Sequence, residues 1–123
     1  MPSDAEKVVS DFCKAWSRRN LDEILGYFTE DAVYHNVPVD PAKGKTAIAG
    51  VINSFLPMAS HVEFRVMKSA SNGNIVFNER MDIFHMGQKV VELPVAGVFE
   101  VTNGKISLWR DYFDMQMFTK QTQ

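Results

Sequence analysis

Three short turn sequences divide the second half of the chain, and this division constrains the fold more than any other feature. The turns are SNGN at 71–74, HMGQ at 85–88 and TNGK at 102–105, and strand-like segments separate them from His61 onward. Asn-Gly and related pairs between such segments are typical of β-hairpins. The sequence therefore predicts four antiparallel strands that follow one another.

Helical patterns fill most of the first half. The sequence SDAE at 3–6 is a capping box with Ser3 as N-cap, and apolar residues follow at helical spacing as far as Trp16. Asn20 opens a second, short helix. After strand-like AVYHN at 32–36 and a Pro-rich loop, helical spacing returns at Ile48 and ends near Pro57.

Helices followed by a meander indicate an α+β fold of a single domain spanning 1–123. We expect the N-terminal helices to pack on the concave face of a strongly curved, mostly antiparallel sheet. Such a sheet encloses a conical space, and the side chains of its concave face point into that space. A chain of 123 residues is long enough to bury one hydrophobic core.

Composition excludes several classes of partner. Thirteen basic against fifteen acidic residues leave a formal charge of -2 with no basic stripe, so nucleic acid is not an expected partner. No apolar run approaches the roughly 20 residues that cross a bilayer, so no membrane span is expected. The single cysteine, Cys13, and an acidic start together predict a cytoplasmic protein.

One charged pair stands out in the predicted second strand of the meander. Arg80 and Asp82 are two residues apart, so they share one face while Met81 and Ile83 lie on the other. Tyr34 and Asn36 share a face of the earlier strand in the same way. Both pairs are candidates for the concave face.

The register of the hairpin predicts apolar neighbours for the charged pair. A two-residue turn at Met86 and Gly87 pairs Arg80 with Leu93 and places Val95 on the same face. In the last strand, Trp109 and Phe113 are each two residues from Asp111 and therefore lie on the same face of the strand. These four apolar residues, Leu93, Val95, Trp109 and Phe113, are the expected wall of a pocket.

Three spaced motifs, AVYHN at 32–36, NERMD at 78–82 and LWRDYFD at 108–114, resemble the limonene-1,2-epoxide hydrolase family. The resemblance runs from the first helix to Phe118. It implies the cone-shaped fold of nuclear transport factor 2 and ketosteroid isomerase, a homodimer formed through the open sheet face that carries Phe77, Met81 and Ile83, and no cofactor. It also implies site residues: an Asp-Arg-Asp catalytic triad of Asp82, Arg80 and Asp111, a water-positioning pair of Tyr34 and Asn36, and two further pocket residues, Phe84 and Phe118.

The triad needs Asp111 on the face of Arg80, and this requirement constrains the last hairpin. A regular two-residue turn at Asn103 and Gly104 would place Asp111 on the opposite face of the sheet. We therefore expect either a three-residue loop, 102–104, or a bulge near Gly97.

The implied residues suit the opening of an epoxide by water. That reaction needs a base for the water and an acid for the leaving oxygen, and two neighbouring carboxylates in an apolar cavity share one proton. We assign Asp111 as base, Asp82 as acid and Arg80 as bridge. The predicted activity is one-step conversion of a small apolar epoxide, similar to limonene-1,2-epoxide, to a vicinal trans diol.

Two other functions stay open at this stage. An isomerase or polyketide cyclase of the same fold would use an Asp base but has less use for a bridging Arg. A non-catalytic module for small-ligand binding or dimerisation would use only the cavity. The three histidines, His35, His61 and His85, show no metal-ligand spacing, so no metal is expected.

Overall fold

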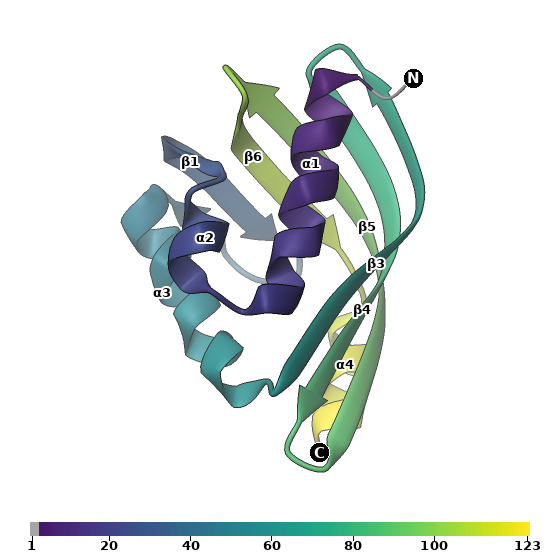
Figure 1. Cartoon of the computed structure of the whole chain (residues 1–123). Coiled ribbons are helices and arrows are strands. Elements are labelled where there is room, and N and C mark those ends of the chain that lie inside the picture. The colour runs from purple at the N-terminus through teal and green to yellow at the C-terminus, as the bar shows by residue number, and fades with distance from the viewer. Residues whose placement is uncertain (1–2) are drawn as a thin grey trace.

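A computed structural model describes residues 3–123 and shows four α-helices, two short 3-10 helices and six strands in this part of the chain (Figure 1). In chain order they are α1 (Asp4–Ala15), η1 (Trp16–Arg18), α2 (Leu21–Leu25), β1 (Phe28–Asn36), β2 (Ala42–Lys43), α3 (Lys45–Phe55), η2 (Leu56–Met58), β3 (His61–Asn72), β4 (Ile75–Met86), β5 (Lys89–Thr102), β6 (Lys105–Tyr112) and α4 (Met115–Thr122). The first three α-helices precede the four strands β3 to β6, as the sequence predicts, and β1 and β2 lie between α2 and α3.

Side-chain caps begin the first two helices at the predicted positions. The Ser3 hydroxyl accepts a hydrogen bond from the Glu6 N–H at 3.1 Å, and the Asn20 side-chain oxygen accepts one from the Glu23 N–H at 2.9 Å. Each cap satisfies a backbone donor that the first turn leaves without a helical partner. Both predicted helix starts are confirmed.

The strands form one curved sheet in the order β2-β1-β6-β5-β4-β3. The four strands from β3 to β6 are joined by consecutive antiparallel hairpins, whereas β1 pairs with β6 in parallel. Helix α1 lies across the concave face and contacts β3, β4, β5 and β6 (Figure 1). The predicted fold, N-terminal helices on a curved and mostly antiparallel sheet, is confirmed.

Aromatic packing joins α1 to the sheet. The ring of Phe12 makes edge-to-face contacts with five other rings, among them Phe28 at 5.3 Å and Trp109 at 4.9 Å between centroids. Such pairs stabilise a core beyond the burial of their area. This cluster fixes α1 over the middle of the sheet and leaves space nearer one end.

The β4–β5 hairpin differs from the predicted register by two residues. Met86 pairs with Lys89, so the turn residues are Gly87 and Gln88 rather than Met86 and Gly87. Gly87 has a φ of 65°, which glycine adopts without steric cost. Arg80 consequently pairs with Val95 instead of Leu93, but a shift of two leaves every side chain on its predicted face.

The β5–β6 hairpin places Asp111 on the same face as Arg80, but by a different irregularity from the one expected. Thr102 pairs with Lys105, so the turn has two residues, Asn103 and Gly104, both with positive φ, and the three-residue loop is wrong. The alternative, a bulge near Gly97, is also wrong, because the pairing there is regular. A bulge at Ser107 of β6 restores the shared face instead: Val101 pairs with Ile106 while Glu100 pairs with Leu108. One extra residue in β6 turns the rest of that strand over.

The C-terminal helix α4 was not anticipated from the sequence. Its N-cap is Asp114, whose carboxylate accepts hydrogen bonds from the N–H groups of Gln116 and Met117. None of its residues is buried, and its apolar residues, Met115, Met117 and Phe118, lie in its first half, so no apolar stripe runs along its whole length. Within residues 3–123, no helix has the length and apolar character needed to cross a membrane.

Candidate active site

The structure brings the two halves of the predicted triad together on the concave face. Arg80 and Asp82 belong to β4 and Asp111 to β6, with β5 between them. Asp111 pairs with Gly97 of β5, and Gly97 pairs in turn with Asn78 of β4. The missing side chain at Gly97 leaves room for Arg80 to reach Asp111 across the intervening strand.

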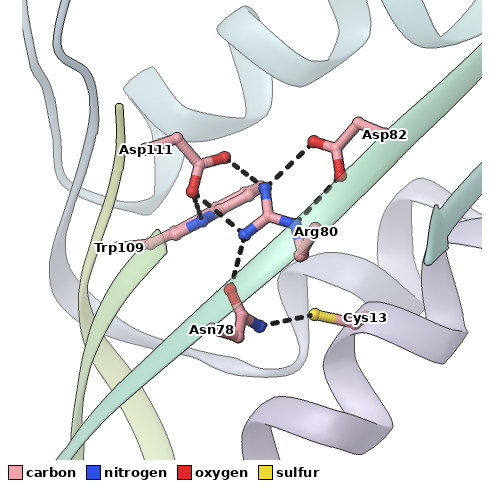
Figure 2. A network of polar contacts seen from close by, with 6 residues as sticks. All are labelled: Cys13, Asn78, Arg80, Asp82, Trp109 and Asp111. Carbon is pink, nitrogen blue, oxygen red and sulfur yellow. Dashed lines mark hydrogen bonds and ion pairs between the residues drawn. The ribbon is translucent and has the colours of Figure 1, made fainter. Parts of the chain in front are cut away.

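The guanidinium of Arg80 bridges both carboxylates (Figure 2). Nε and Nη2 donate to the two oxygens of Asp82, each at 2.9 Å. Nη2 and Nη1 donate to Asp111 Oδ2 and Oδ1 at 2.7 and 3.2 Å, and Nη1 also donates to Asn78 Oδ1 at 3.1 Å. These contacts occupy the five N–H donors that a guanidinium carries, so the plane of Arg80 is fixed from every side.

Burial makes this arrangement electrostatically demanding. Arg80 is fully buried, with its guanidinium carbon 4.9 Å from the centre of the Phe64 ring, and Asp82 and Asp111 are 4% and 3% exposed. Removing charges from water is costly unless they are paired and hydrogen-bonded. One Arg between two carboxylates leaves the triad neutral only when the carboxylates share a proton.

The protonation of the triad follows from the same burial. Burial raises the pKa of Asp82 from its ordinary 3.8 to about 6; Arg80 opposes this rise and Asp111 adds to it. Burial by itself lowers the pKa of Arg80, but the two carboxylates outweigh it and hold that pKa well above the ordinary value. Asp82 therefore retains its proton to a higher pH than an ordinary aspartic acid, while Arg80 stays charged.

Trp109 supports Asp111 instead of lining the pocket. Its indole N–H donates to Asp111 Oδ1 at 2.7 Å, and its ring stacks on Tyr34 with 4.1 Å between centroids. Trp109 is fully buried behind the site, so the expectation that it forms pocket wall is wrong. The two-residue periodicity of the strand predicted the correct face for Trp109, but this side chain lies too deep under α1 to reach the cavity.

Asn78 and Cys13 extend the network away from the cavity (Figure 2). The Asn78 amide accepts from Arg80 through Oδ1 and donates through Nδ2 to Cys13 Sγ at 3.7 Å. Burial raises the pKa of Cys13 to about 12, so the thiol stays neutral. This contact joins helix α1 to the strand that carries Arg80.

Tyr34 and Asn36 approach the triad from β1. Because β1 pairs with β6, Tyr34 lies beside Trp109 and Asn36 beside Asp111. Both side chains line the same cavity as Asp111 and Asp82. Burial raises the pKa of Tyr34, so its phenol keeps its proton and is able to donate a hydrogen bond.

The cavity beside these groups has a volume of about 240 Å³. Of the predicted wall, Leu93, Val95, Phe113, Phe84 and Phe118 line it. Five further lining residues escaped the sequence reasoning: Val39, Phe55, Phe64, Met86 and Met115. Phe64 could have been found from its pairing opposite Asp82, whereas Val39 and Phe55 come from a loop and a helix whose orientations no strand pattern gives.

Polar atoms are few in this cavity. The four polar side chains among its lining residues are Tyr34, Asn36, Asp82 and Asp111, and the others are apolar. Within residues 3–123, no cluster of three or more His, Cys, Asp or Glu side chains is arranged to hold a metal ion. The cavity can therefore place an uncharged, apolar molecule against two carboxyl groups, one Tyr and one Asn.

Comparisons with known proteins identify relatives of this chain. Residues 3–123 match the model of the limonene-1,2-epoxide hydrolase catalytic domain. The epoxide hydrolase EphG of Mycobacterium tuberculosis is 32% identical over 107 residues, which cover 87% of this chain and 71% of that protein. The structure of a limonene-epoxide-hydrolase-like epoxide hydrolase from M. tuberculosis is 31% identical, covers 97% of this chain and 90% of its own, and superposes with a TM-score of 0.85.

Other solved structures share the fold at lower identity. A protein from Catenulispora acidiphila with a ketosteroid isomerase-like fold has a TM-score of 0.82 at 20% identity, covering 93% of this chain and 90% of that one. SalBIII, described as an epoxide hydrolase/cyclase-like enzyme of pyran ring formation in salinomycin, has a TM-score of 0.82 at 21% identity, covering 91% and 92%. These likenesses show the fold alone.

Gly97 offers a direct test of the triad geometry. A Cβ at this position would lie 2.5 Å from Arg80 Nη1, 2.8 Å from Asn78 Oδ1 and 3.0 Å from Asp111 Oδ1. We expect Gly97→Ala to displace the guanidinium and lower epoxide turnover at least about 10²-fold, because small misplacements of reacting groups cost that much. Steady-state kinetics on a small epoxide measure the loss.

Gly50→Ala is the matched control, because a Cβ at Gly50 in helix α3 meets no atom within 4 Å. The control should keep wild-type turnover and melt at the same or a higher temperature. Near-normal turnover in the Gly97→Ala variant would show that the bridged arrangement is not needed for activity.

Proposed function

This chain belongs to the limonene-1,2-epoxide hydrolase family, and we propose that it converts a small, largely apolar epoxide to a vicinal trans diol in one step. Limonene-1,2-epoxide is the model for the substrate. The observation that carries the proposal is the bridging of Asp82 and Asp111 by Arg80 beside an apolar cavity. The reaction uses no cofactor and no covalent intermediate.

Asp111 is the general base in this mechanism. Its Oδ1 accepts hydrogen bonds from Arg80 and Trp109, whereas its Oδ2 accepts one from Arg80. Oδ2 therefore keeps a lone pair for the proton of the attacking water. Tyr34 and Asn36 line the cavity near Asp111 and hold the water through its remaining hydrogen-bonding positions.

Asp82 is the general acid. Its raised pKa keeps a proton on the carboxyl, and the epoxide oxygen takes that proton as its C–O bond breaks. Water oxygen forms the new C–O bond from the opposite side of the ring, which makes the diol trans. One proton enters Asp111 as another leaves Asp82, so the triad keeps the same total charge.

Arg80 makes this exchange possible. A planar guanidinium holds both carboxylates in fixed positions and stabilises whichever of them is ionised. Because Asp111 gains one proton as Asp82 loses another, the net charge of the triad does not change, and the buried site needs no new counter-ion during the reaction. A return of the proton from Asp111 to Asp82, through water or the diol, restores the starting state.

The cavity supports a small substrate with little polarity beyond the epoxide. Its volume of about 240 Å³ lies below the roughly 300 to 1,000 Å³ of usual ligand pockets. The polar side chains among its lining residues are the four that the mechanism already uses. A substrate with additional charged or hydrogen-bonding groups would leave those groups unpaired on binding.

Homodimerisation is part of the proposal, through the convex face of the sheet. Phe77 on this face is 49% exposed and Met81 is half-buried, which suits an apolar contact, whereas Ile83 is already buried within one chain.

The alternatives to a hydrolase are an isomerase or cyclase of the same fold and a non-catalytic binding module. A turnover assay on a small epoxide without added metal or cofactor separates them from a hydrolase, because neither alternative forms a diol.

The roles of the two carboxyl groups are tested by amide substitution. Asp111→Asn and Asp82→Asn should each remove nearly all turnover, since an amide neither takes the water's proton nor supplies one, and each proton transfer contributes about 10² to 10⁴ in rate. The two losses should be non-additive because the triad acts as a unit. Rates of diol formation and circular dichroism spectra measure activity and folding.

A single turnover in water labelled with heavy oxygen tests the one-step reaction. Label should enter the diol, and none should enter the protein. Heavy oxygen found in Asp111 or Asp82 by mass spectrometry would mean an ester intermediate and would contradict direct attack by water.

Activity should fall with rising pH on the alkaline side of the pKa of Asp82. The acid must be protonated, so kcat/KM should decrease about tenfold per pH unit once the pH exceeds that pKa, which is about 6 in the free protein.

The raised pKa of Asp82 also makes the free energy of unfolding depend on pH. A carboxyl whose pKa is raised by folding stabilises the fold fully below its unfolded value, 3.8, and loses this contribution as pH rises through about 6.

Chemical denaturation between pH 4 and 7 measures the stability effect without any substrate, and Asp82→Asn should remove that part of the pH dependence. A wild-type protein whose pH dependence of unfolding equals that of the Asp82→Asn variant would contradict the assignment of the shared proton to Asp82.

Apolar wall residues should control selectivity and not the chemistry. Leu93→Ala, Val95→Ala and Phe113→Ala should change which epoxide enantiomer or carbon is attacked, because about 1 to 3 kcal/mol of contact difference reverses a modest preference. Chiral chromatography of the diols measures the change. Val90→Ala is the matched control, since Val90 lies on the same strand but is 50% exposed and away from the cavity. Unaltered selectivity in all three wall variants would place the pocket elsewhere.

A further inference from the structure

One stretch of β5 has a strand neighbour on one side only. The β5–β6 pairing extends as far as Ala96 and Tyr112, so residues 89–95 pair with β4 but not with β6. In the part of the chain that the structure describes, no other strand adjoins this edge. Exposed strand edges carry free N–H and C=O groups, and proteins usually cover or pair them.

Helix α4 covers this edge, and the side chain of Gln121 takes the place of a strand. Its Oε1 accepts from the Glu92 N–H and its Nε2 donates to the Glu92 C=O, both at 2.8 Å. The carboxamide thus repeats the two hydrogen bonds that a paired residue would make. Lys89 adds a contact from Nζ to the Thr122 C=O at 2.9 Å, at the end of the helix.

The same helix forms one wall of the cavity. Met115 and Phe118 line it together with the triad carboxyl groups, although no residue of α4 is buried. Helix α4 has eight residues and packs against β5 (Figure 1). A helix this short is not stable alone, so contacts with β5 must keep it in place.

We propose that Gln121 is a positioning residue that sets the size of the epoxide the cavity accepts. The proposal rests on the proposed hydrolase function and assigns its substrate selectivity to a residue outside the cavity. By pairing with Glu92, Gln121 holds Met115 and Phe118 against the substrate. Without this pairing, α4 withdraws from the cavity, which becomes wider on that side.

The widening affects small and large epoxides differently. A compact epoxide such as cyclohexene oxide fills the narrow cavity only when the α4 wall presses it toward Asp82. A bulkier one, such as cis-stilbene oxide, extends to that wall and gains room when it moves. The ratio of the two affinities therefore reports on α4, whereas a general loss of stability would weaken both alike.

The test compares variants in an Asp111→Asn background, where binding is measured without turnover. Gln121→Ala should raise the Kd of cyclohexene oxide about tenfold, the scale of small apolar contact differences. The Kd of cis-stilbene oxide should stay constant or fall. Gln121→Glu should give an intermediate ratio, because a carboxylate accepts from the Glu92 N–H but cannot donate to its C=O.

Gln116→Ala is the matched control, since Gln116 lies on the same helix, is exposed, and uses its backbone N–H, not its side chain, in the cap. It should leave both Kd values unchanged. Amide hydrogen exchange supplies a second readout: exchange at Glu92 and along α4 should accelerate in Gln121→Ala and not in Gln116→Ala.

The outcomes separate this proposal from the hydrolase function. Equal changes in both Kd values, or unchanged hydrogen exchange at Glu92 and α4, would overturn the role of Gln121 alone. A shifted ratio of affinities with no diol formed by the wild-type protein would overturn the hydrolase function alone. If neither epoxide bound to the Asp111→Asn protein, both the role of Gln121 and the hydrolase function would be contradicted.

Discussion

The buried ion triad of Arg80, Asp82 and Asp111 is the interaction on which the rest of the structure depends. A guanidinium and two carboxyl groups in an apolar interior are tolerable only when every donor has an acceptor and one proton is shared. The five N–H groups of Arg80 meet five oxygen contacts, and Asp82 has the raised pKa that sharing requires. The pairing that makes these buried charges tolerable thus includes a proton shared between the two carboxyl groups.

Several details of the sheet exist because of this triad. Gly97 supplies no side chain where Arg80 must pass over β5, and the bulge at Ser107 turns Asp111 to the concave face. Trp109 lies behind Asp111 and donates a hydrogen bond to its Oδ1, whereas Oδ2 accepts one from Arg80. None of these three residues lines the cavity, yet each affects the positions of the triad side chains.

The sequence predicted what periodicity and capping control, and it missed what depends on depth and on irregular pairing. The caps at Ser3 and Asn20 and the shared face of Arg80 and Asp82 follow from local rules, and all were found. The predicted β4–β5 register differed from the observed one by two residues, and this error left every side chain on its predicted face because strand faces repeat every two residues. The residues around Ser107 do not indicate a bulge, because the need for it comes from other strands: Asp111 must share a face with Arg80 of β4.

The same distinction explains the cavity. Wall residues on strands, such as Leu93 and Val95, were predictable by parity, whereas Met115 on the exposed helix α4 was not. Trp109 was placed on the correct face but at the wrong depth, because parity gives a direction and says nothing about the helix that lies above. Residue patterns therefore predict the part of the cavity that strands form, but not the parts that the loop and the two helices form.

The parallel pairing of β1 with β6 also determines the order in which the site can form. Asp111 is synthesised long after Asn36, its partner in the β1–β6 pairing. Contacts between such distant segments form late and slow the folding of a domain. Until β6 arrives, β1 lacks the neighbour on that side, and the aromatic rings that will cover Trp109 have no centre to pack around. In a nascent chain, Asn36 and Asp111 therefore cannot come into register until β6 has been made.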